Sequence, residues 1–272
     1  MPPAALALAL MSAGVHATWN LLLARARDPQ GATAVALITA AIVGAPVAAA
    51  WWSLDSAAVP FVVVSIVLEA VYFALLAAAY TRAELSVVYP LARGLAPVFV
   101  LVGTVAFAGA SSSTAQTVGV LLVGGGVLLV RGLRRGDTVG FVFGLAIAVC
   151  IASYTVVDKH GVAHATPVAY LELISIGMAV CYCTMLLVAR GAAPIRAEAN
   201  AASALAGVAT FAAYALVLAA LRLAPAASVA AVRETSVLIA TALAAVVLKE
   251  RVTAWRLAGA VLVVGGVALI SL

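Results

Sequence analysis

Two arginine residues stand inside otherwise apolar stretches of the chain, and their side chains have the clearest capacity to bind a solute. Arg93 lies in the segment YPLARGLAP, and Arg233 lies in the segment AVRETSV. A cation near the centre of a bilayer costs about 2.5 to 3.5 kcal/mol on insertion scales, so it usually faces the interior of a helix bundle or a water-filled path. Because guanidinium groups bind carboxylates and phosphates in a bidentate manner, the pair predicts an anionic or zwitterionic solute.

Carboxyl groups inside other apolar stretches offer a competing interpretation. Glu69 lies near the middle of the apolar segment 59–80, where it is either the ion-pair partner of Arg93 or a group that takes up a coupling proton. Glu234 points about 100° away from Arg233 around a helix, so the two neighbours cannot share a face and each needs its own partner. Together with Glu172, these carboxyl groups leave a cationic solute open as an alternative.

Further polar side chains on the expected helices are candidates for the wall of a cavity. His16 and Asn20, in the segment HATWN, lie one helical turn apart, and Tyr72 lies about one turn from Glu69. Such residues either form hydrogen bonds between helices or line a cavity. The predicted solute-binding residues are Arg93, Arg233, Glu69, Asn20, His16 and Tyr72.

Sequence patterns typical of enzymes are weak in this chain, so they give little support to an enzymatic function. His160 and His164, near Asp158, have a spacing that metal ligands can share, but we expect them in a solvated loop. The chain has no G-x-x-x-x-G-K-[ST] pattern, so direct ATP hydrolysis is not expected. We therefore expect a protein that is not an enzyme, with no catalytic residues, no cofactor and no metal site.

The composition indicates a membrane protein. Hydrophobic residues make up 66% of the chain, charged residues 9%, and the mean hydropathy is +1.22. A soluble domain has roughly 25% charged residues. Apolar blocks of about 20 residues, the length needed to cross a hydrocarbon core of about 30 Å, recur along the chain. The expected fold is an all-α integral membrane protein with ten transmembrane helices at 3–23, 31–52, 59–80, 85–108, 114–131, 138–157, 166–189, 201–221, 226–248 and 254–271.

An internal repeat organises these helices. Residues 119–130, GVLLVGGGVLLV, and residues 259–270, GAVLVVGGVALI, share seven identities in twelve positions at a spacing of 140 residues, and the same offset relates Arg93 to Arg233. Ten helices therefore divide into five-helix repeats at 1–131 and 138–272. Because five is odd, the two repeats must enter the membrane in opposite orientations, which predicts an inverted repeat.

Glycines recur within the repeat and predict close helix packing. Gly119, Gly125 and Gly126 have Gly259, Gly265 and Gly266 as counterparts. Small residues let transmembrane helices approach one another, either within one protomer or across a homodimer.

Basic residues in the expected connections favour one orientation. Eleven of the fifteen lie in connections that follow odd-numbered spans, whereas two lie on the opposite side. By the positive-inside rule, this asymmetry favours both termini outside. The net charge of +5 is then an orientation signal and a source of lipid headgroup contacts, not a nucleic-acid surface.

Three segments carry a resemblance to a known family. HATWN, YPLARGLAP and VRETSVLIATALAAVVLKERVTAWRLAGAVLVVGGVAL resemble the EamA family of the drug/metabolite transporter superfamily. The resemblance covers essentially the whole chain. It implies a ten-helix inverted-repeat carrier that works by alternating access, often as an exporter of amino acids, with helices four and nine lining a central cavity. Members commonly have both termini in the cytoplasm, so the orientation stays open.

The predicted function is secondary-active transport, as a probable exporter, of small polar metabolites such as amino acids. The alternative is a proton-coupled exporter of cations or drugs that uses Glu69, and an intramembrane enzyme or a sensor is the less favoured class. The expected partners are a small-molecule solute, a coupling proton or other ion and the lipid bilayer, without nucleic acid, and the glycine pattern leaves open a homodimer. The expected location is the plasma membrane, with multiple passes.

Overall fold

The computed structural model describes residues 1–107, 109, 111–131, 138–247 and 253–272. The predicted linker between the repeats falls largely on 132–137, and three basic or acidic residues of the expected final connection fall on 249–251. Both segments lie outside the described residues.

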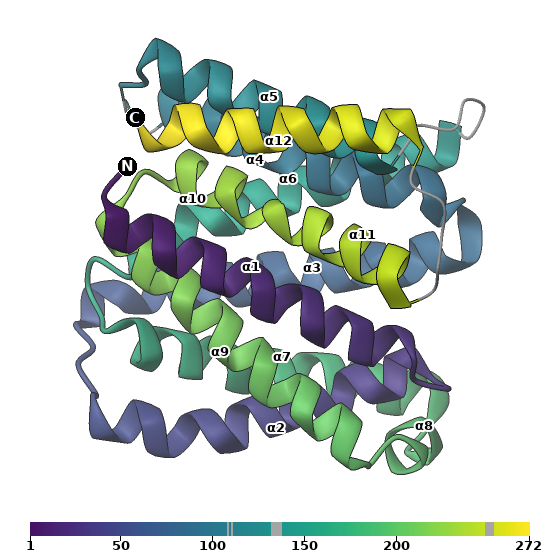
Figure 1. Ribbon diagram of the computed structural model, residues 1–272. Coiled ribbons are helices and arrows are strands. Elements are labelled where there is room, and N and C mark those ends of the chain that lie inside the picture. The colour runs from purple at the N-terminus through teal and green to yellow at the C-terminus, as the bar shows by residue number, and fades with distance from the viewer. Residues whose placement is uncertain (108, 110, 132–137, 248–252) are drawn as a thin grey trace.

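Helices form all of the regular structure that is described, and they run side by side in one bundle (Figure 1). The α-helices are α1 (Pro3–Ala24), α2 (Pro29–Ala50), α3 (Val59–Arg82), α4 (Leu85–Phe107), α5 (Thr114–Arg131), α6 (Thr138–Gly161), α7 (Pro167–Arg190), α8 (Ala193–Ala197), α9 (Ala201–Leu223), α10 (Ala226–Arg233), α11 (Thr235–Val247) and α12 (Ala254–Ser271). A short 3-10 helix, η1 (Ser56–Ala58), precedes α3.

Residues at the helix starts explain several of these boundaries. Proline occupies the first turn of α1, α2, α3 and α7, where its missing N–H costs no helical hydrogen bond. The Asp28 side chain caps α2 by accepting from the backbone N–H groups of Gln30 and Gly31, both at 3.1 Å. Asn200 caps α9 in the same way through Ser203 N, at 3.0 Å.

The described helices make this an all-α, multi-pass membrane protein. Seven of them are long and apolar enough to cross a membrane, against ten in the prediction. They are Pro29–Ala50, Ser56–Ala79, Val87–Ala106, Thr138–Gly161, Pro167–Arg190, Ala201–Leu223 and Ala254–Ser271. The expected continuous helix 226–248 is instead two helices, α10 and α11, which Glu234 separates.

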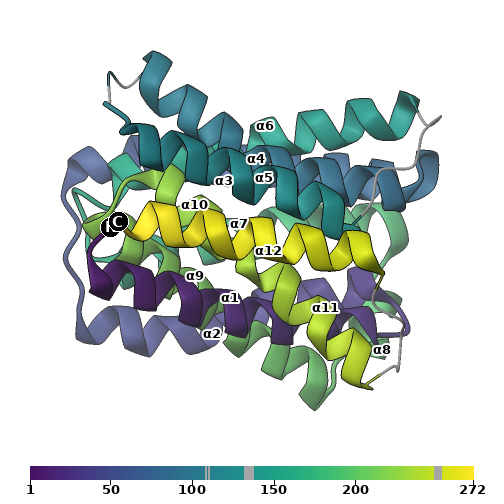
Figure 2. The same ribbon diagram turned by 45° about the horizontal axis from the view of Figure 1, so that its top comes forward.

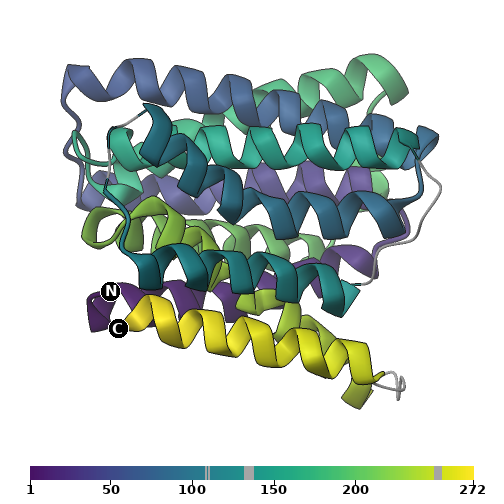
Figure 3. The same cartoon turned by 90° about the horizontal axis from the view of Figure 1, so that it is seen from above.

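Glycine governs the contact between α5 and α12, which lie side by side along their length (Figures 1 and 3). A Cβ atom on Gly119 would lie 2.7 Å from the carbonyl oxygen of Gly266, and one on Gly126 would lie 2.6 Å from that of Gly259. The start of α5 therefore meets the end of α12, so the two helices are antiparallel. The absence of side chains at these four positions allows the backbones to touch.

The bundle has two ends, which we call end A and end B. End A holds the two chain termini, which lie together (Figures 1 and 2), with the Met1 amino group 3.3 Å from the carbonyl oxygen of Ile270. The connections 51–58 and 162–166 also lie at end A, where Asp55 N donates to His164 O at 2.9 Å and Thr166 N donates to Ser53 O at 2.8 Å. End B holds the connections 25–28 and 191–200.

Candidate functional site

A cavity of about 990 Å³ occupies the middle of the bundle and extends to end B. At that end it is lined by residues of the α1–α2 connection, including Arg25, Arg27 and Asp28, and by Arg190 at the end of α7. None of the described residues of the end-A connections 51–58 and 162–166 belongs to its wall. The cavity therefore reaches one end of the bundle and not the other.

The structure brings all six predicted solute-binding residues to the wall of this cavity. His16 and Asn20 come from α1, Glu69 and Tyr72 from α3, Arg93 from α4, and Arg233 from the last turn of α10. Aromatic side chains that are not among the predicted solute-binding residues complete the wall. They are Trp19, Phe73, Tyr89, Tyr154, Tyr182, Phe211 and Tyr214.

Arg93 pairs with Glu234, which corrects the expectation that its ion-pair partner is Glu69. The Nε atom of Arg93 lies 3.1 Å from Oε2 of Glu234, and both side chains are largely buried. The break between α10 and α11 explains the pairing: Glu234 is the C-cap residue of α10, and α10 packs against α4. The neighbours Arg233 and Glu234 do have separate partners, as the helical geometry predicted.

His16 receives two hydrogen-bond donors that it cannot satisfy together. A terminal nitrogen of Arg93 lies 3.2 Å from its Nε2 atom, and the indole N–H of Trp19 points at its Nδ1 atom from 3.2 Å. A neutral imidazole has one acceptor nitrogen, and a charged one has none. At least one of the two donors therefore lacks its acceptor on His16, and the same terminal nitrogen of Arg93 also donates to Ser236 Oγ at 3.4 Å.

Arg233 lies over the ring of Tyr214, with its guanidinium carbon 5.7 Å from the ring centroid. Its Nε atom is buried and forms no hydrogen bond with the described residues. Glu69 and Asp158 are the acidic groups that interact with it electrostatically. Glu69 is therefore a neighbour of the second arginine, not of Arg93.

The remaining predicted residues contribute less directed contacts. Asn20 is exposed and donates to His16 O of its own helix at 2.8 Å. The Tyr72 ring meets the edges of Tyr154, at a centroid distance of 6.5 Å, and of Phe73, at 5.0 Å. Both residues line the cavity.

Sequence reasoning missed Asp158 as a member of this site. The expected helix ended at 157, so Asp158 was assigned to a solvated loop, but α6 continues to Gly161 and buries Asp158 completely. The Tyr170 hydroxyl donates to its Oδ1 atom at 3.0 Å, and the Tyr214 hydroxyl donates to its Oδ2 atom. The four-residue spacing from Tyr154, which places both side chains on one helix face, is the sequence signal that would have found it.

His160 and His164, which the sequence raised as a metal-capable pair, lie near Asp158 at end A. Both rings stack against Phe61, at centroid distances of 6.2 and 6.0 Å. Neither belongs to the cavity wall.

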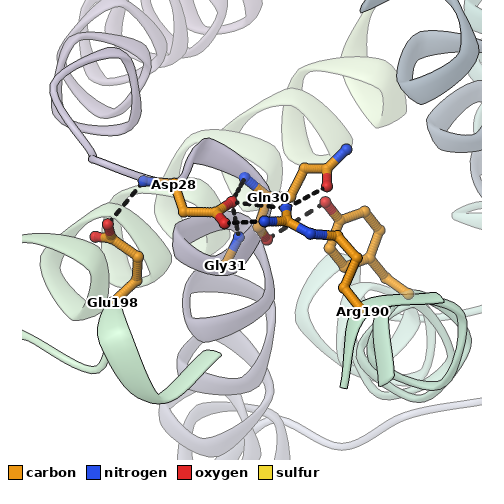
Figure 4. Close-up of polar contacts among 6 residues, drawn as sticks. Asp28, Gln30, Gly31, Arg190 and Glu198 are labelled. Carbon is orange, nitrogen blue, oxygen red and sulfur yellow. Dashed lines mark hydrogen bonds and ion pairs between the residues drawn. The ribbon is translucent and has the colours of Figure 1, made fainter. Parts of the chain in front are cut away.

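A polar cluster at end B joins the rim of the cavity to α7 (Figure 4). Arg190 binds Asp28 through NH2 and Oδ2 at 2.6 Å and also donates to Gln30 Oε1 at 2.8 Å. The backbone N–H of Asp28 donates to Glu198 Oε1 at 2.8 Å. The hydrogen bond from Arg190 lowers the pKa of Asp28 below its ordinary value of 3.8, and backbone N–H donors add to this effect against the opposing effect of burial.

Comparison with known proteins places part of the chain in a family. The model of the EamA-like transporter family matches residues 138–272. A crystal structure of a protein that is 16% identical superposes with a TM-score of 0.77, over 98% of this chain and 97% of that one, which shows a shared fold. No curated protein sequence matches the chain. Residues 138–272 are therefore a domain of the EamA-like transporter family, which is part of the drug/metabolite transporter superfamily.

Proposed function

We propose that the protein is a secondary-active carrier that exports small polar metabolites, such as amino acids, across the plasma membrane. It works by alternating access between two inverted five-helix repeats, residues 1–131 and 138–272. The first repeat comprises α1 to α5. The second comprises α6, α7, α9, the broken span formed by α10 and α11, and α12, which gives ten spans.

The glycine contacts support the inverted repeat. Gly119 meets Gly266, and Gly126 meets Gly259. At the repeat spacing of 140 residues, Gly259 corresponds to Gly119 and Gly266 corresponds to Gly126. Each glycine of α5 thus contacts the counterpart of the other, which is the relation that a two-fold axis between antiparallel helices produces.

The packing of the other helices has the same reciprocity. The packed pair α1 and α9 has its counterpart in the pair α6 and α3. The pair α2 and α9 has its counterpart in the pair α7 and α3. The pair α4 and α6 has its counterpart in the contact of α10 and α11 with α1. The helices α2 and α7, which are counterparts of each other, pack together. An exchange of the two repeats therefore reproduces most of the interhelical contacts.

The extension of the cavity to end B supports alternating access and export. The cavity reaches end B, whereas hydrogen-bonded connections cover end A. The connections at end B also carry most of the basic residues, including Arg25, Arg27 and Arg196. By the positive-inside rule, end B is the cytoplasmic end, so this conformation loads solute from the cytoplasm.

The competition between two hydrogen-bond donors for His16 is the observation that supports the proposed class of solute. Arg93 and Trp19 leave one N–H donor for a ligand acceptor, and a carboxylate is the acceptor that binds most strongly beside a guanidinium. Glu69, on the same cavity wall, supplies the complementary acceptor for an ammonium group. Both guanidinium groups already have acidic neighbours, so a zwitterion fits this wall better than a dianion.

A proton-coupled exporter of organic cations is the second candidate. The seven aromatic residues that line the cavity beside the predicted site favour it, because aromatic faces attract cations. This function predicts that Glu69→Gln abolishes transport while Arg93→Ala leaves it largely intact.

Counterflow in proteoliposomes tests the two candidates. Vesicles with purified protein are loaded with an amino acid, an organic acid or a lipophilic cation, and entry of the labelled compound is followed. We expect saturable counterflow of amino acids that Arg93→Ala abolishes. Arg222→Ala, which removes an exposed arginine at the end of α9, is the matched control and should transport normally. Counterflow of lipophilic cations alone would contradict the amino-acid carrier.

A further inference from the structure

We propose that Asp158 binds a coupling proton in a site one layer behind the cavity wall and exchanges it with Glu69 through the hydroxyl group of Tyr214. This inference rests on the proposed function, because a coupling proton has a use only in a carrier. It goes beyond it by assigning a second carboxyl and a route between the two.

Asp158 is shielded from the cavity and is closely surrounded by hydroxyl groups. Its side chain is 0% exposed and does not line the cavity. Tyr170 of α7 and Tyr214 of α9 donate to its two carboxyl oxygens. Ser65 of α3, also fully buried, lies beside the same carboxyl, although its hydroxyl forms no hydrogen bond of normal geometry with the described residues.

The two tyrosines differ in the surroundings of their rings. Tyr170 is 0% exposed, and its ring packs on Gly161, where a Cβ atom would lie 2.3 Å from the ring. Tyr214 lines the cavity together with Glu69, and the two side chains are close enough to interact. Tyr214 is therefore the hydroxyl that connects Asp158 with the cavity, while Tyr170 only anchors Asp158.

The charges around this site leave room for one additional proton. Two guanidinium groups, those of Arg93 and Arg233, face three carboxyl groups, those of Glu69, Asp158 and Glu234. His16 is counted as neutral, because only a neutral imidazole offers an acceptor to either of its two neighbouring donors. With every carboxyl ionised, the buried cluster has one negative charge in excess, and an uncompensated buried charge is costly.

A proton on Glu69 or Asp158 removes that excess. Glu69 and Asp158 are like-charged neighbours of each other, and Arg233 interacts with both. Two neighbouring carboxyls of this kind titrate as a pair that holds one proton more readily than none. Glu69 faces the cavity, so it exchanges with water there, whereas Asp158 lies in the last turn of α6, toward end A.

The transfer leaves tyrosine unchanged. The proton of the Glu69 carboxyl passes to the Tyr214 oxygen while the Tyr214 hydroxyl proton passes to Oδ2 of Asp158. Glu69 becomes an anion, Asp158 becomes neutral, and Tyr214 is again a hydroxyl. The ring of Tyr214 also lies under Arg233, so movement of that residue on solute binding would alter the route.

Infrared titration of the purified protein tests proton binding without any transport. Wild type should show a protonated-carboxyl band that disappears as the pH rises, and Asp158→Asn should lose part of it. Glu69→Gln should shift the pH at which the rest disappears, because the two groups titrate together. Asp55→Asn, which removes a surface carboxyl at end A, is the control and should leave the buried band unchanged. Identical bands in wild type and Asp158→Asn would overturn the proposal.

A proton-flux assay tests the route. Proteoliposomes with a pH-sensitive dye inside receive a gradient of the amino acid that gives counterflow. Asp158→Asn and Tyr214→Phe should reduce solute-driven proton flux to that of protein-free vesicles and should reduce counterflow less than proton flux, and thermal unfolding in detergent checks that both variants fold. Tyr170→Phe removes the other hydroxyl donor and should keep proton flux with a shifted pH dependence.

The outcomes separate this inference from the proposed function. Counterflow by wild type without proton flux, or full proton flux in Asp158→Asn, would overturn the proton site and leave the carrier intact. An absence of counterflow with every solute would overturn the carrier, and the infrared titration would still decide whether Asp158 takes up a proton.

Discussion

Gly119 and Gly266 approach each other so closely that neither position has room for a methyl group. A Cβ atom on Gly119 would lie 2.7 Å from the carbonyl oxygen of Gly266, and one on Gly266 would lie 2.6 Å from that of Gly119. The contact joins α5 to α12, with the side chains of Ile270 and Val123 packed beside it. It sets how far apart α5 and α12 can lie.

Substitution at this contact should destabilise the protein in a position-specific way. Gly119→Ala forces the two helices apart, which we expect to cost about 1 to 3 kcal/mol, the usual cost of overpacking. Gly125→Ala is the matched control, since a Cβ atom there would meet nothing within 4 Å. It should be neutral, or stabilise by up to about 1 kcal/mol through helix propensity. Thermal unfolding in detergent measures both, and equal melting temperatures would contradict the contact.

Protonation of Asp28 should weaken the cluster at end B. Asp28 lies outside the membrane-spanning helices, and its partner Arg190 lowers its pKa. The folded protein therefore binds the proton less readily than the unfolded chain. The contribution of the pair to stability is complete above the ordinary pKa of 3.8 and is lost as the pH falls through the lower folded-state value.

The effect should be small, because 44% of the Arg190 side chain is exposed. We expect less than about 1 kcal/mol, as for other exposed ion pairs. Unfolding measured across acidic pH should show a dependence that Asp28→Asn reduces. Asp55→Asn, at a helix start without an arginine partner, serves as the control and should retain the dependence of wild type.

Replacement of Glu172 should stabilise the protein. Its carboxyl is buried, neither oxygen forms a hydrogen bond with the described residues, and its Oε2 atom lies close to Gly44. A buried polar group without a partner costs about 1 to 3 kcal/mol, and Glu172→Leu removes that cost. Glu198→Leu provides the contrast, because Glu198 is also buried but accepts from Asp28 N and should lose stability. A lower melting temperature for Glu172→Leu would show that the carboxyl has a partner or a role in folding.

The orientation of the two ends should be visible by thiol labelling. In a background without native cysteines, Arg196→Cys places a thiol at end B and Ser111→Cys places one in the α4–α5 connection at end A. Both positions are exposed. An impermeant reagent should label the second in intact cells and the first only after the membrane is opened. The reverse labelling pattern would place end B outside the cell. The cavity would then load solute from the outside in this conformation, as expected of an importer.

The sequence by itself predicted the membrane class, most of the helices and six residues that the structure places on the cavity wall. Hydropathy decides where a chain crosses a bilayer, since each span must satisfy its backbone hydrogen bonds internally and needs no distant partner. The predicted helix boundaries were wrong at the places where hydropathy is the weakest guide. Glu234 interrupts one expected helix, and α6 runs past 157 far enough to bury Asp158.

Only the tertiary structure decided which of these residues meet. Arg93 finds Glu234, which is 141 residues away in the sequence, because α10 packs against α4, while Glu69 falls beside Arg233 and Asp158. A sequence pattern defines the face of one helix, but ion pairs between helices depend on their rotation and axial position. Close contacts such as that between Gly119 and Gly266 set the rotation and axial position of each helix, and these contacts depend on how all helices of the bundle fit together.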